Sequence, residues 1–285
     1  MPTFRQMIAG PEPVYAPLVF NPLTALLAEQ AGFRALYLGG GSMGYVKCGT
    51  EANLSLTEMA EAALDIRTVS RLPLILDGAC GWGDPMHVAR AIGMTEAAGF
   101  AAIEIEDQIM PKRAHHHIGI EHLVPSELME AKIRAATGAR RDPDLVIIGR
   151  TNAVRNTGID DALRRAEAYK RAGADMLYVT GRKPEDVRLF GERLPPPLMF
   201  MAGAGGLAAS EFSRAELYRL GYRLIVDPTT PLMAAHKALR ACYAALAADQ
   251  PDPLLGAEPG KEQAEVHKTI GLDRMLQIER DTVER

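Results

Sequence analysis

The residues best suited to chemistry in this sequence are acids and an arginine, each at the end of a short apolar run. The runs and their polar ends are LPLIL with Asp77, AAIEI with Glu106 and Asp107, and LVIIG with Arg150. If consecutive runs are neighbouring strands, Asp77 and Glu106 lie within reach of one hard cation, and Mg²⁺ prefers such oxygen ligands. The alternative is that one acid caps a helix or pairs with Arg150.

A second group of residues is suited to binding an anion. The planar guanidinium of Arg150 matches a carboxylate, unless it is used in an internal ion pair. The run ALYL contains Tyr37 and leads into Gly39, Gly40 and Gly41. This turn has no side chains, so its N–H groups can face an anion, although a tight turn without a ligand explains it equally well. Together these residues predict a small, charged pocket.

Eight apolar runs, separated by helix-like stretches, must position these residues. The runs are nearly continuous rather than alternating, which is typical of parallel strands buried on both faces. Several of the stretches end at a glycine before the next run, as helices commonly do. Eight such units in 285 residues favour a (β/α)₈ TIM barrel. The runs are 14–20, 35–40, 72–79, 101–107, 145–151, 176–181, 197–203 and 223–228.

The barrel is expected to occupy residues 1–249, and residues 250–285 form a linker and a helical extension. The linker QPDPLLGAEPGKEQ is rich in proline and glycine, and the amphipathic segment VHKTIGLDRMLQIERDTVER follows it. One barrel offers no place for this helix, so we expect it to pack on a neighbouring subunit. The alternative is a tail that folds back on its own barrel.

The composition excludes several classes of partner. The chain is 47% hydrophobic and 24% charged, with a formal net charge of -4. Nucleic acids and anionic membranes attract clustered lysine and arginine, so neither is an expected partner, and a small molecule is. Three cysteines without C-x-x-C spacing suit a reducing cytoplasm. No stretch reaches about 18 uncharged apolar residues, so no membrane span is expected.

The sequence resembles the isocitrate lyase and phosphoenolpyruvate mutase superfamily, in particular its short, 2-methylisocitrate lyase-like members. The resemblance implies a homotetramer or homodimer with exchanged C-terminal helices. It also implies Mg²⁺, or Mn²⁺ in its place, that stabilises the enolate of a 2-oxo acid. The segments that carry it span nearly the whole chain: AEQAGFRALYLGGG, LPLILDGACGWGDPMHVAR, AGFAAIEIEDQIMPKR, DPDLVIIGRTNA, GIDDALRRAEAYKRAGADMLYV, LYRLGYRLIVDP and GLDRMLQIER.

The resemblance also implies roles for individual residues. Asp77 and Glu106 correspond to metal-side acids, and Asp77 also to a substrate contact. Arg150 corresponds to the residue that binds a substrate carboxylate. Two further sets correspond to substrate-binding residues: Tyr37 with Gly39, Gly40 and Gly41 in the turn, and Lys112 with Arg113 in a loop.

The sequence departs from the family pattern at five places. One is the loop before LSLTE, where Thr50 or Glu51 stands near the position of an expected aspartate. Ala79 stands where lyases of the family have a second acid, and Ala114 replaces the cysteine that donates a proton. Thr180 replaces a glutamate, and the segment MFMAGAGG lacks the usual acid. The residues of the family pattern are therefore retained better in the first half of the pocket than in the second. The affinity for a metal ion and the identity of the general acid stay open.

Three consecutive histidines follow the loop lysine. Neighbouring residues of a strand or helix point in different directions, so a three-histidine metal site is not expected. One hypothesis is that His115 or His116 supplies the missing proton, since imidazole titrates near neutral pH. The other is that the histidines form hydrogen bonds in a polar lid.

The predicted function is Mg²⁺-dependent carbon–carbon lyase activity on a small 2-hydroxy or 2-oxo di- or tricarboxylate. An enolate is the intermediate, Arg150 holds a carboxylate, and Tyr37 and Glu51 are candidate bases. One alternative is an oxaloacetate decarboxylase or 2-oxo acid hydrolase of the same superfamily. Another is a barrel that binds a carboxylate without catalysis.

Overall fold

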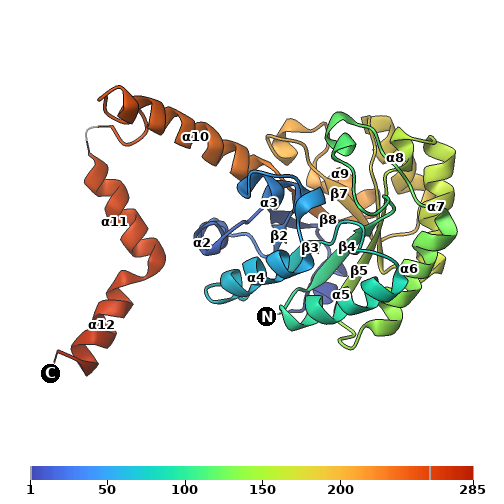
Figure 1. Ribbon diagram of the computed structural model, residues 1–285, viewed down its shortest axis with the longest axis horizontal. Coiled ribbons are helices and arrows are strands. Elements are labelled where there is room, and N and C mark those ends of the chain that lie inside the picture. The colour runs from blue at the N-terminus through green and yellow to red at the C-terminus, as the bar shows by residue number, and fades with distance from the viewer. Residues whose placement is uncertain (1, 257, 285) are drawn as a thin grey trace.

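The protein folds into a parallel barrel. The structure, a computed structural model, describes residues 2–256 and 258–284. All strand pairs are parallel, in the order β1-β8-β7-β6-β5-β4-β3-β2. A bridge from Leu18 to Tyr37 joins the two edges into a nearly closed barrel (Figure 1). The strands are β1 Val14–Pro17, β2 Leu36–Leu38, β3 Leu74–Asp77, β4 Ala102–Glu106, β5 Val146–Thr151, β6 Met176–Val179, β7 Leu198–Met201 and β8 Tyr222–Asp227.

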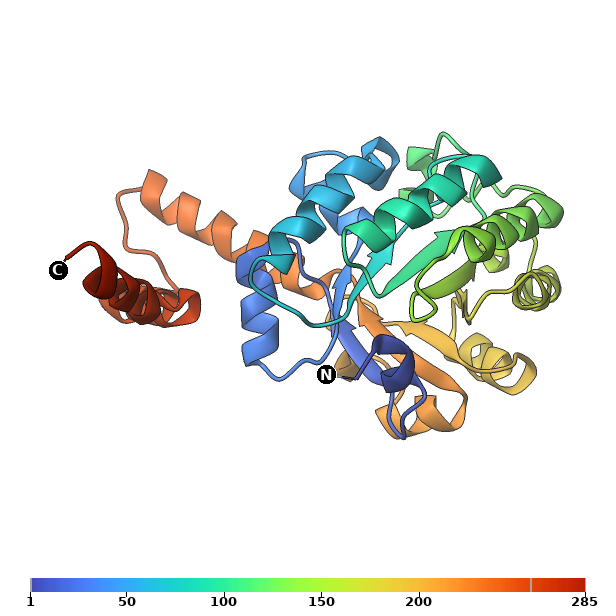
Figure 2. The ribbon, with the colours of Figure 1, turned by 90° about the horizontal axis from the view of Figure 1, so that it is seen from below.

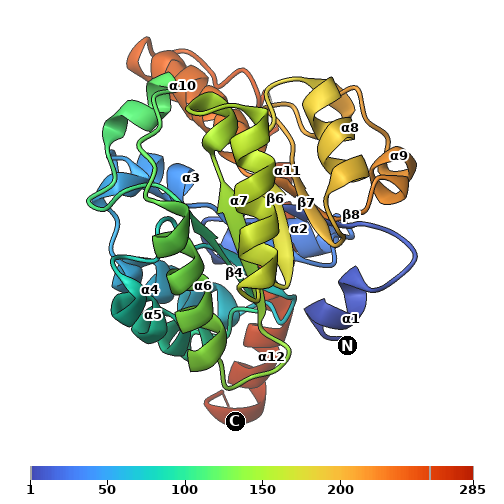
Figure 3. The same ribbon diagram turned by 90° about the vertical axis from the view of Figure 1, so that its right-hand side faces the viewer.

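Helices alternate with the strands and cover the outside of the barrel. Figure 3 shows α6 (Ser126–Ala139) and α7 (Ile159–Arg171) across the outer face of the sheet. Each of the eight predicted runs overlaps a strand, so the (β/α)₈ prediction is confirmed. The other helices are α1 Phe4–Ile8, α2 Pro22–Gln30, α3 Gly40–Val46, α4 Leu56–Arg67, α5 Pro85–Ala97, α8 Pro184–Arg193, α9 Arg214–Arg219, α10 Thr230–Ala247, α11 Pro259–Ile270 and α12 Leu272–Thr282, with short 3₁₀ turns at η1 Glu51–Asn53, η2 Ala114–Ile118, η3 Ala153–Arg155 and η4 Leu207–Ala209.

Two apolar layers hold the barrel together, because successive residues of a strand point to opposite faces. One layer fills the barrel interior and includes Tyr37, Ile75 and Ile148. The other lies between the sheet and the helices and includes Leu36, Leu76 and Ile147. The strands are buried on both faces, which explains their nearly continuous apolar sequences.

Local sequence signals set the ends of the helices. Ser55 accepts a hydrogen bond from the amide of Glu58, and the Glu58 side chain accepts one from the amide of Ser55, so α4 begins with a capping box. The helix-to-strand turns use glycines with positive φ, a conformation that costs glycine little. Their φ angles are +89° at Gly32, +78° at Gly99, +112° at Gly173 and +89° at Gly221.

The last three helices form an arm that leads away from the barrel (Figures 1 and 2). No residue of α10, α11 or α12 that the structure describes is buried. The arm returns to the barrel where Thr269 of α11 donates a hydrogen bond to Gln30 at the end of α2, at 3.5 Å. No helix within 2–256 or 258–284 combines the length and apolar character needed to cross a membrane. The arm begins with α10, before residue 249. The expected boundary between a barrel of residues 1–249 and an extension of residues 250–285 stays a prediction.

Candidate active site

The ends of strands β3, β4 and β5 bring the predicted site residues to one end of the barrel. Asp77 is the last residue of β3 and Glu106 the last of β4, and Arg150 lies next to Glu106 in the register of β4 and β5. Their side chains are almost completely buried: the exposed fraction is 7% for Asp77 and 1% for Glu106. A parallel barrel puts the carboxyl ends of its strands at one face, where such folds place their chemistry.

The glycine turn is the start of helix α3 and is held by Asp77. The amide of Gly40 donates to Oδ2 of Asp77 at 3.0 Å, and the amide of Ala79 donates to Oδ1 at 3.0 Å. A Cβ at position 40 would lie 3.1 Å from Oε2 of Glu51 and 3.2 Å from Oδ2 of Asp77. A side chain at position 40 would therefore crowd two carboxylates, which would have to shift by a few tenths of an ångström, and the anion facing the Gly40 amide is a protein side chain.

Glu106 is the most highly connected acid of the site. Its Oε2 accepts from Nδ2 of Asn152 at 2.7 Å and from Nε2 of Gln108 at 3.2 Å, and Nε of Arg150 lies 3.2 Å away. Lys112 contacts Oε1. Burial raises the pKa of Glu106, and the positive charge of Arg150 acts in the opposite direction.

Arg150 takes part in internal ion pairs, which was one of the two alternatives left open by the sequence. Its Nη1 donates to Oε1 of Glu104 at 2.6 Å, while Nε and Nη2 donate to Oδ1 of Asn152 at 3.2 and 3.1 Å. Its guanidinium also lies over the ring of Tyr178, 5.1 Å from the centroid. The side chain keeps 15% exposure, so these contacts do not bury it completely.

Glu104 is a site residue that the sequence analysis missed. It lies on the same face of β4 as Glu106, and the alternation of Ile103, Glu104, Ile105 and Glu106 was the available signal. Tyr37, which is completely buried, donates from its hydroxyl to Oε2 of Glu104 at 3.3 Å. Burial raises the pKa of Glu104 to about 7; the charge of Asp77 adds to this, and Arg150 opposes it. The pKa of Tyr37 is also raised, by burial and by Asp77.

A lid formed by residues 109–122 closes over this end of the barrel. Its two ends are joined where Gln108 pairs with Leu123 in an antiparallel bridge. Lys112 is buried and contacts the carboxylates of both Glu51 and Glu106. Burial lowers the pKa of Lys112, but two touching carboxylates stabilise its ammonium form, so we treat it as charged.

The three consecutive histidines of the lid differ in their partners. Nδ1 of His116 lies 2.7 Å from the carbonyl oxygen of Arg113, and Nε2 lies 3.0 Å from Oε1 of Glu51. His115 faces His122, at 3.4 Å between ring nitrogens, and His117 faces the Tyr45 hydroxyl, at 3.1 Å.

The contacts of His116 place a proton between it and Glu51. A carbonyl oxygen only accepts, so Nδ1 carries a hydrogen, and the contact between Nε2 and Glu51 needs one more proton on either partner. Burial lowers the pKa of His116. The side chains of Arg113 and His115 are exposed, whereas the thiol of Cys80 is buried and burial raises its pKa.

The charges at this end of the barrel do not balance. We define the acidic cluster as six side chains that contact one another or lie beside Gly40: Glu51, Asp77, Glu104, Glu106, Lys112 and Arg150. With all of them ionised, four carboxylates face two cations. Buried charge of one sign needs compensation, and a divalent cation with oxygen preference supplies it.

The acidic cluster fits a partly hydrated Mg²⁺. Asp77 and Glu106 come from adjacent strands, but Ala79 offers no second acid beside Asp77. Within the described chain, no group of three His, Cys, Asp or Glu side chains is close enough to hold an ion by itself. A Mg²⁺ ion held by Asp77 and Glu106 would therefore need water for its remaining ligands, as Mg²⁺ commonly allows.

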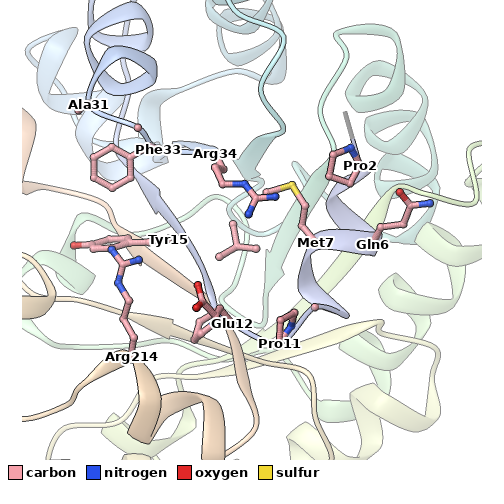
Figure 4. Close-up of a pocket in the computed structure, with 14 residues that line it drawn as sticks. Pro2, Gln6, Met7, Pro11, Glu12, Tyr15, Ala31, Phe33, Arg34 and Arg214 are labelled. Carbon is pink, nitrogen blue, oxygen red and sulfur yellow. The ribbon is translucent and has the colours of Figure 1, made fainter.

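A pocket that the described residues form lies elsewhere. It has a volume of about 360 Å³, and its lining includes Tyr15, Phe33, Arg34 and Arg214 (Figure 4). Val14 and Arg34 precede or begin β1 and β2, so this pocket opens near the amino ends of those strands, away from the acidic cluster. None of the predicted site residues lines it.

Comparisons with known proteins agree with this geometry. A family model described as phosphoenolpyruvate phosphomutase matches residues 4–247. A 2,3-dimethylmalate lyase from Eubacterium barkeri is 33% identical, with 96% of this chain and 95% of that protein covered. A 2-methylisocitrate lyase from Aeropyrum pernix is 38% identical over 82% of this chain and 75% of that protein. A solved phosphonopyruvate hydrolase with oxalate and Mg²⁺ superimposes with a TM-score of 0.84 at 29% identity, covering 98% and 97% of the two chains.

Proposed function

The chain belongs to the phosphoenolpyruvate phosphomutase family, and on this premise we propose that it is a Mg²⁺-dependent carbon–carbon lyase. Its substrate is a small 2-hydroxy or 2-oxo di- or tricarboxylate, cleaved through an enolate. Relatives named as lyases support the reaction class, and a solved relative that holds Mg²⁺ supports the ion. The family resemblance and the barrel predicted from the sequence are thereby confirmed.

The observation that carries this proposal is the position of Arg150 beside an excess of carboxylates. A partly exposed guanidinium binds one substrate carboxylate, and the acids around it provide the place for a cation. Asp77 and Glu106 would hold the ion, which when bound stabilises negative charge on an oxyanion. Arg150 orients the substrate, and the closed lid excludes water from the cleaved bond.

The residues that move protons are Glu51 and His116. Retro-aldol cleavage needs a base for the substrate hydroxyl and a donor for the enolate carbon. Glu51 and His116 share a proton at 3.0 Å and lie on two segments that meet above the acidic cluster. Tyr37 is the weaker base candidate, because its buried hydroxyl already donates to Glu104 and its pKa is raised.

Lys112 belongs to the substrate side of the proposal. Its ammonium group lies between Glu51 and Glu106, so it links the lid to the pocket. Arg113 begins η2 with an exposed side chain and turns toward the substrate only if the lid rearranges. The proposal therefore assigns Lys112 the closer contact with the substrate.

A second candidate function is decarboxylation or hydrolysis of a 2-oxo acid such as oxaloacetate. Ala114 favours it, since the lid position that would carry a proton-donating cysteine has none. A small enolate can be protonated by solvent, so this reaction tolerates the loss. The two functions differ in the bond that breaks and in the second product.

The arm supports an oligomer with exchanged C-terminal helices, a homotetramer or a homodimer. Large apolar side chains remain exposed on it, and such surfaces are commonly covered by a neighbouring subunit. A cytoplasmic location stays a prediction from the cysteine content. The exposed apolar residues include Leu239, Tyr243, Leu246, Leu254, Ile270, Met275 and Ile278.

A substrate panel tests the proposed function. The purified protein is incubated with 2,3-dimethylmalate, 2-methylisocitrate and oxaloacetate, with Mg²⁺ or with EDTA, and loss of substrate and formation of each carboxylic acid product are followed by chromatography. The lyase proposal predicts Mg²⁺-dependent release of a 2-oxo acid and a second carboxylic acid from a hydroxy acid. Turnover of oxaloacetate alone, with CO₂ or oxalate as the second product, identifies the second candidate. No turnover of any compound contradicts both.

A further inference from the structure

Glu104 is a buried acid for which the proposed reaction has no role. Its exposed fraction is 1%, and it lies on the barrel side of β4 at the level of Asp77 in the register. Two side chains contact it, Arg150 at 2.6 Å and the hydroxyl of Tyr37 at 3.3 Å. A buried carboxylate is costly unless it is paired, so this position requires an explanation beyond packing.

The contacts of Arg150 show what Glu104 leaves for a substrate. Arginine has five N–H groups. Nε is used by Asn152 and Glu106, one N–H of Nη1 by Glu104, and one N–H of Nη2 by Asn152. Within the described chain, the remaining N–H on each terminal nitrogen has no partner. Arg150 therefore keeps an N–H on each terminal nitrogen for a substrate carboxylate, and its positive charge is already offset from inside the barrel.

We propose that Glu104 is a positioning and specificity-determining residue, which fixes Arg150 and limits the negative charge that the pocket accepts. The substrate class that follows is a dicarboxylate without a third anionic group. This inference rests on the proposed function, in which Arg150 binds a substrate carboxylate. It narrows that function, because a tricarboxylate or a phosphono-carboxylate is bound less well.

The physical reason is electrostatic. The acidic cluster carries two negative charges in excess when all its members are ionised, and the proton that His116 shares with Glu51 offsets one of them. Glu104 contributes one negative charge next to Arg150, the only arginine of the cluster. With the shared proton, a bound divalent cation would leave the site one positive charge. A ligand with two negative charges would then leave one negative charge in excess, and a ligand with three would leave two. Like charges at low dielectric repel strongly, so the third charge is the one that is rejected.

Two ligands of similar size test this selection by charge. Oxalate carries two negative charges, and phosphonoformate carries nearly three at pH 8. Calorimetric titration at saturating Mg²⁺ gives the ratio of their dissociation constants. We expect the parent protein to prefer oxalate by about tenfold or more, and Glu104→Gln to reduce this preference about tenfold. The glutamine keeps an acceptor for Arg150 and removes only the charge.

Asp175→Asn is the matched control. Asp175 pairs with Arg5 at 3.1 Å and contacts Arg140, and it directly precedes β6 at the opposite end of the barrel. The Asp175→Asn variant loses one carboxylate outside the acidic cluster. Its preference for oxalate over phosphonoformate should therefore stay within about twofold of the parent value. A purely structural role of Glu104 would weaken both ligands equally and leave the ratio unchanged.

Three results overturn the inference: an unchanged ratio in Glu104→Gln, an equal change in Asp175→Asn, or a parent protein that binds phosphonoformate as tightly as oxalate. The last measurement needs no variant, so the inference is tested even if Glu104→Gln does not fold.

The variant Arg150→Met distinguishes a failure of the proposed function from a failure of this inference alone. If it binds oxalate like the parent, the carboxylate contact of the proposed function is wrong; if it loses oxalate while the Glu104→Gln ratio is unchanged, only the inference fails.

Discussion

The two sides of the barrel mouth differ in their chemistry. On the side formed by β3 to β5, Glu106 and Arg150 contact each other, and Glu106 also contacts Lys112, while Asp77 accepts from the amides of Gly40 and Ala79. On the side formed by β6 to β8, Thr180 donates a hydrogen bond to Asn152 at 3.0 Å. Asp227 accepts from the amides of Thr229 and Thr230 at 3.2 and 2.9 Å.

This difference shows that an acid at a strand end is not by itself a catalytic residue. Oδ1 of Asp227 is used by backbone amides at the start of α10, a structural task. Glu106 instead contacts side chains, including Lys112 from the lid. We infer that bond cleavage is confined to the β3–β5 side and that the other side shapes the cavity.

The largest expected effect is that of removing Arg150. Arg150→Met should lower kcat/KM by about 1000-fold, because it removes both the carboxylate contact and a charge that balances two buried acids. Arg188→Met is the matched control on the other side, where Arg188 pairs with Glu216 at 3.4 Å, and should change kcat/KM less than about twofold. Steady-state kinetics of the two variants decide the question; equal losses would contradict a one-sided site.

The next effect concerns proton transfer in the lid. His116→Gln should lower kcat by about 100-fold and remove one limb of the pH–rate profile, since it breaks the shared proton with Glu51. His115→Gln, whose exposed ring faces only His122, should leave both unchanged. Profiles that are the same in the parent and in His116→Gln would exclude His116 as the proton carrier.

A gain of function sharpens the comparison further. Ala79→Asp should raise the affinity for Mn²⁺ about tenfold by restoring an acid beside Asp77. Ala79 has a φ of 44°, a conformation that aspartate tolerates better than most residues. Gly203→Asp adds an acid after β7, on the other side, where a Cβ meets nothing within 4 Å, and should not change the affinity. An equal gain in both variants would mean that any added acid binds the ion.

The smallest effect is on the pH dependence of stability. Burial raises the pKa of Glu104 to about 7 from 4.5, so the folded state binds more protons between these values. Its stabilising contribution is complete below pH 4.5 and is lost as the pH rises through 7. Urea unfolding of the parent should therefore show a loss of up to about 1.4 kcal/mol per pH unit that Glu104→Gln lacks. Parallel curves for the two proteins at pH 5 and pH 8 would contradict the raised pKa.

The sequence predicted the barrel because its strands are buried on both faces, and such strands are short apolar runs. It also located Asp77, Glu106 and Arg150, since the end of a run marks the end of a strand. Glu104 was missed because it lies inside an apolar run, where a single acid gives little signal without knowledge of the face it occupies. Helix α3 was missed because three glycines are typical of a turn.

The remaining features depend on contacts between distant segments. Lys112 and Glu51 are 61 residues apart and meet only when the lid docks beside η1. The ion pairs of Arg150 were predicted as one of two alternatives, and the structure was needed to show that an ion pair and a partly exposed guanidinium coexist. The sequence likewise did not predict that α10 leads away from the barrel, because its apolar residues resemble those of a helix that packs on the barrel.

The most direct test of the account is a Mn²⁺ titration followed by electron paramagnetic resonance. We predict about one ion per chain in the parent protein, bound at least about 100-fold more weakly by Glu106→Gln and unchanged in Asp227→Asn. This result would place the ion on the β3–β5 side. A parent protein that binds no Mn²⁺, or a Glu106→Gln variant with the parent affinity, would contradict the central claim.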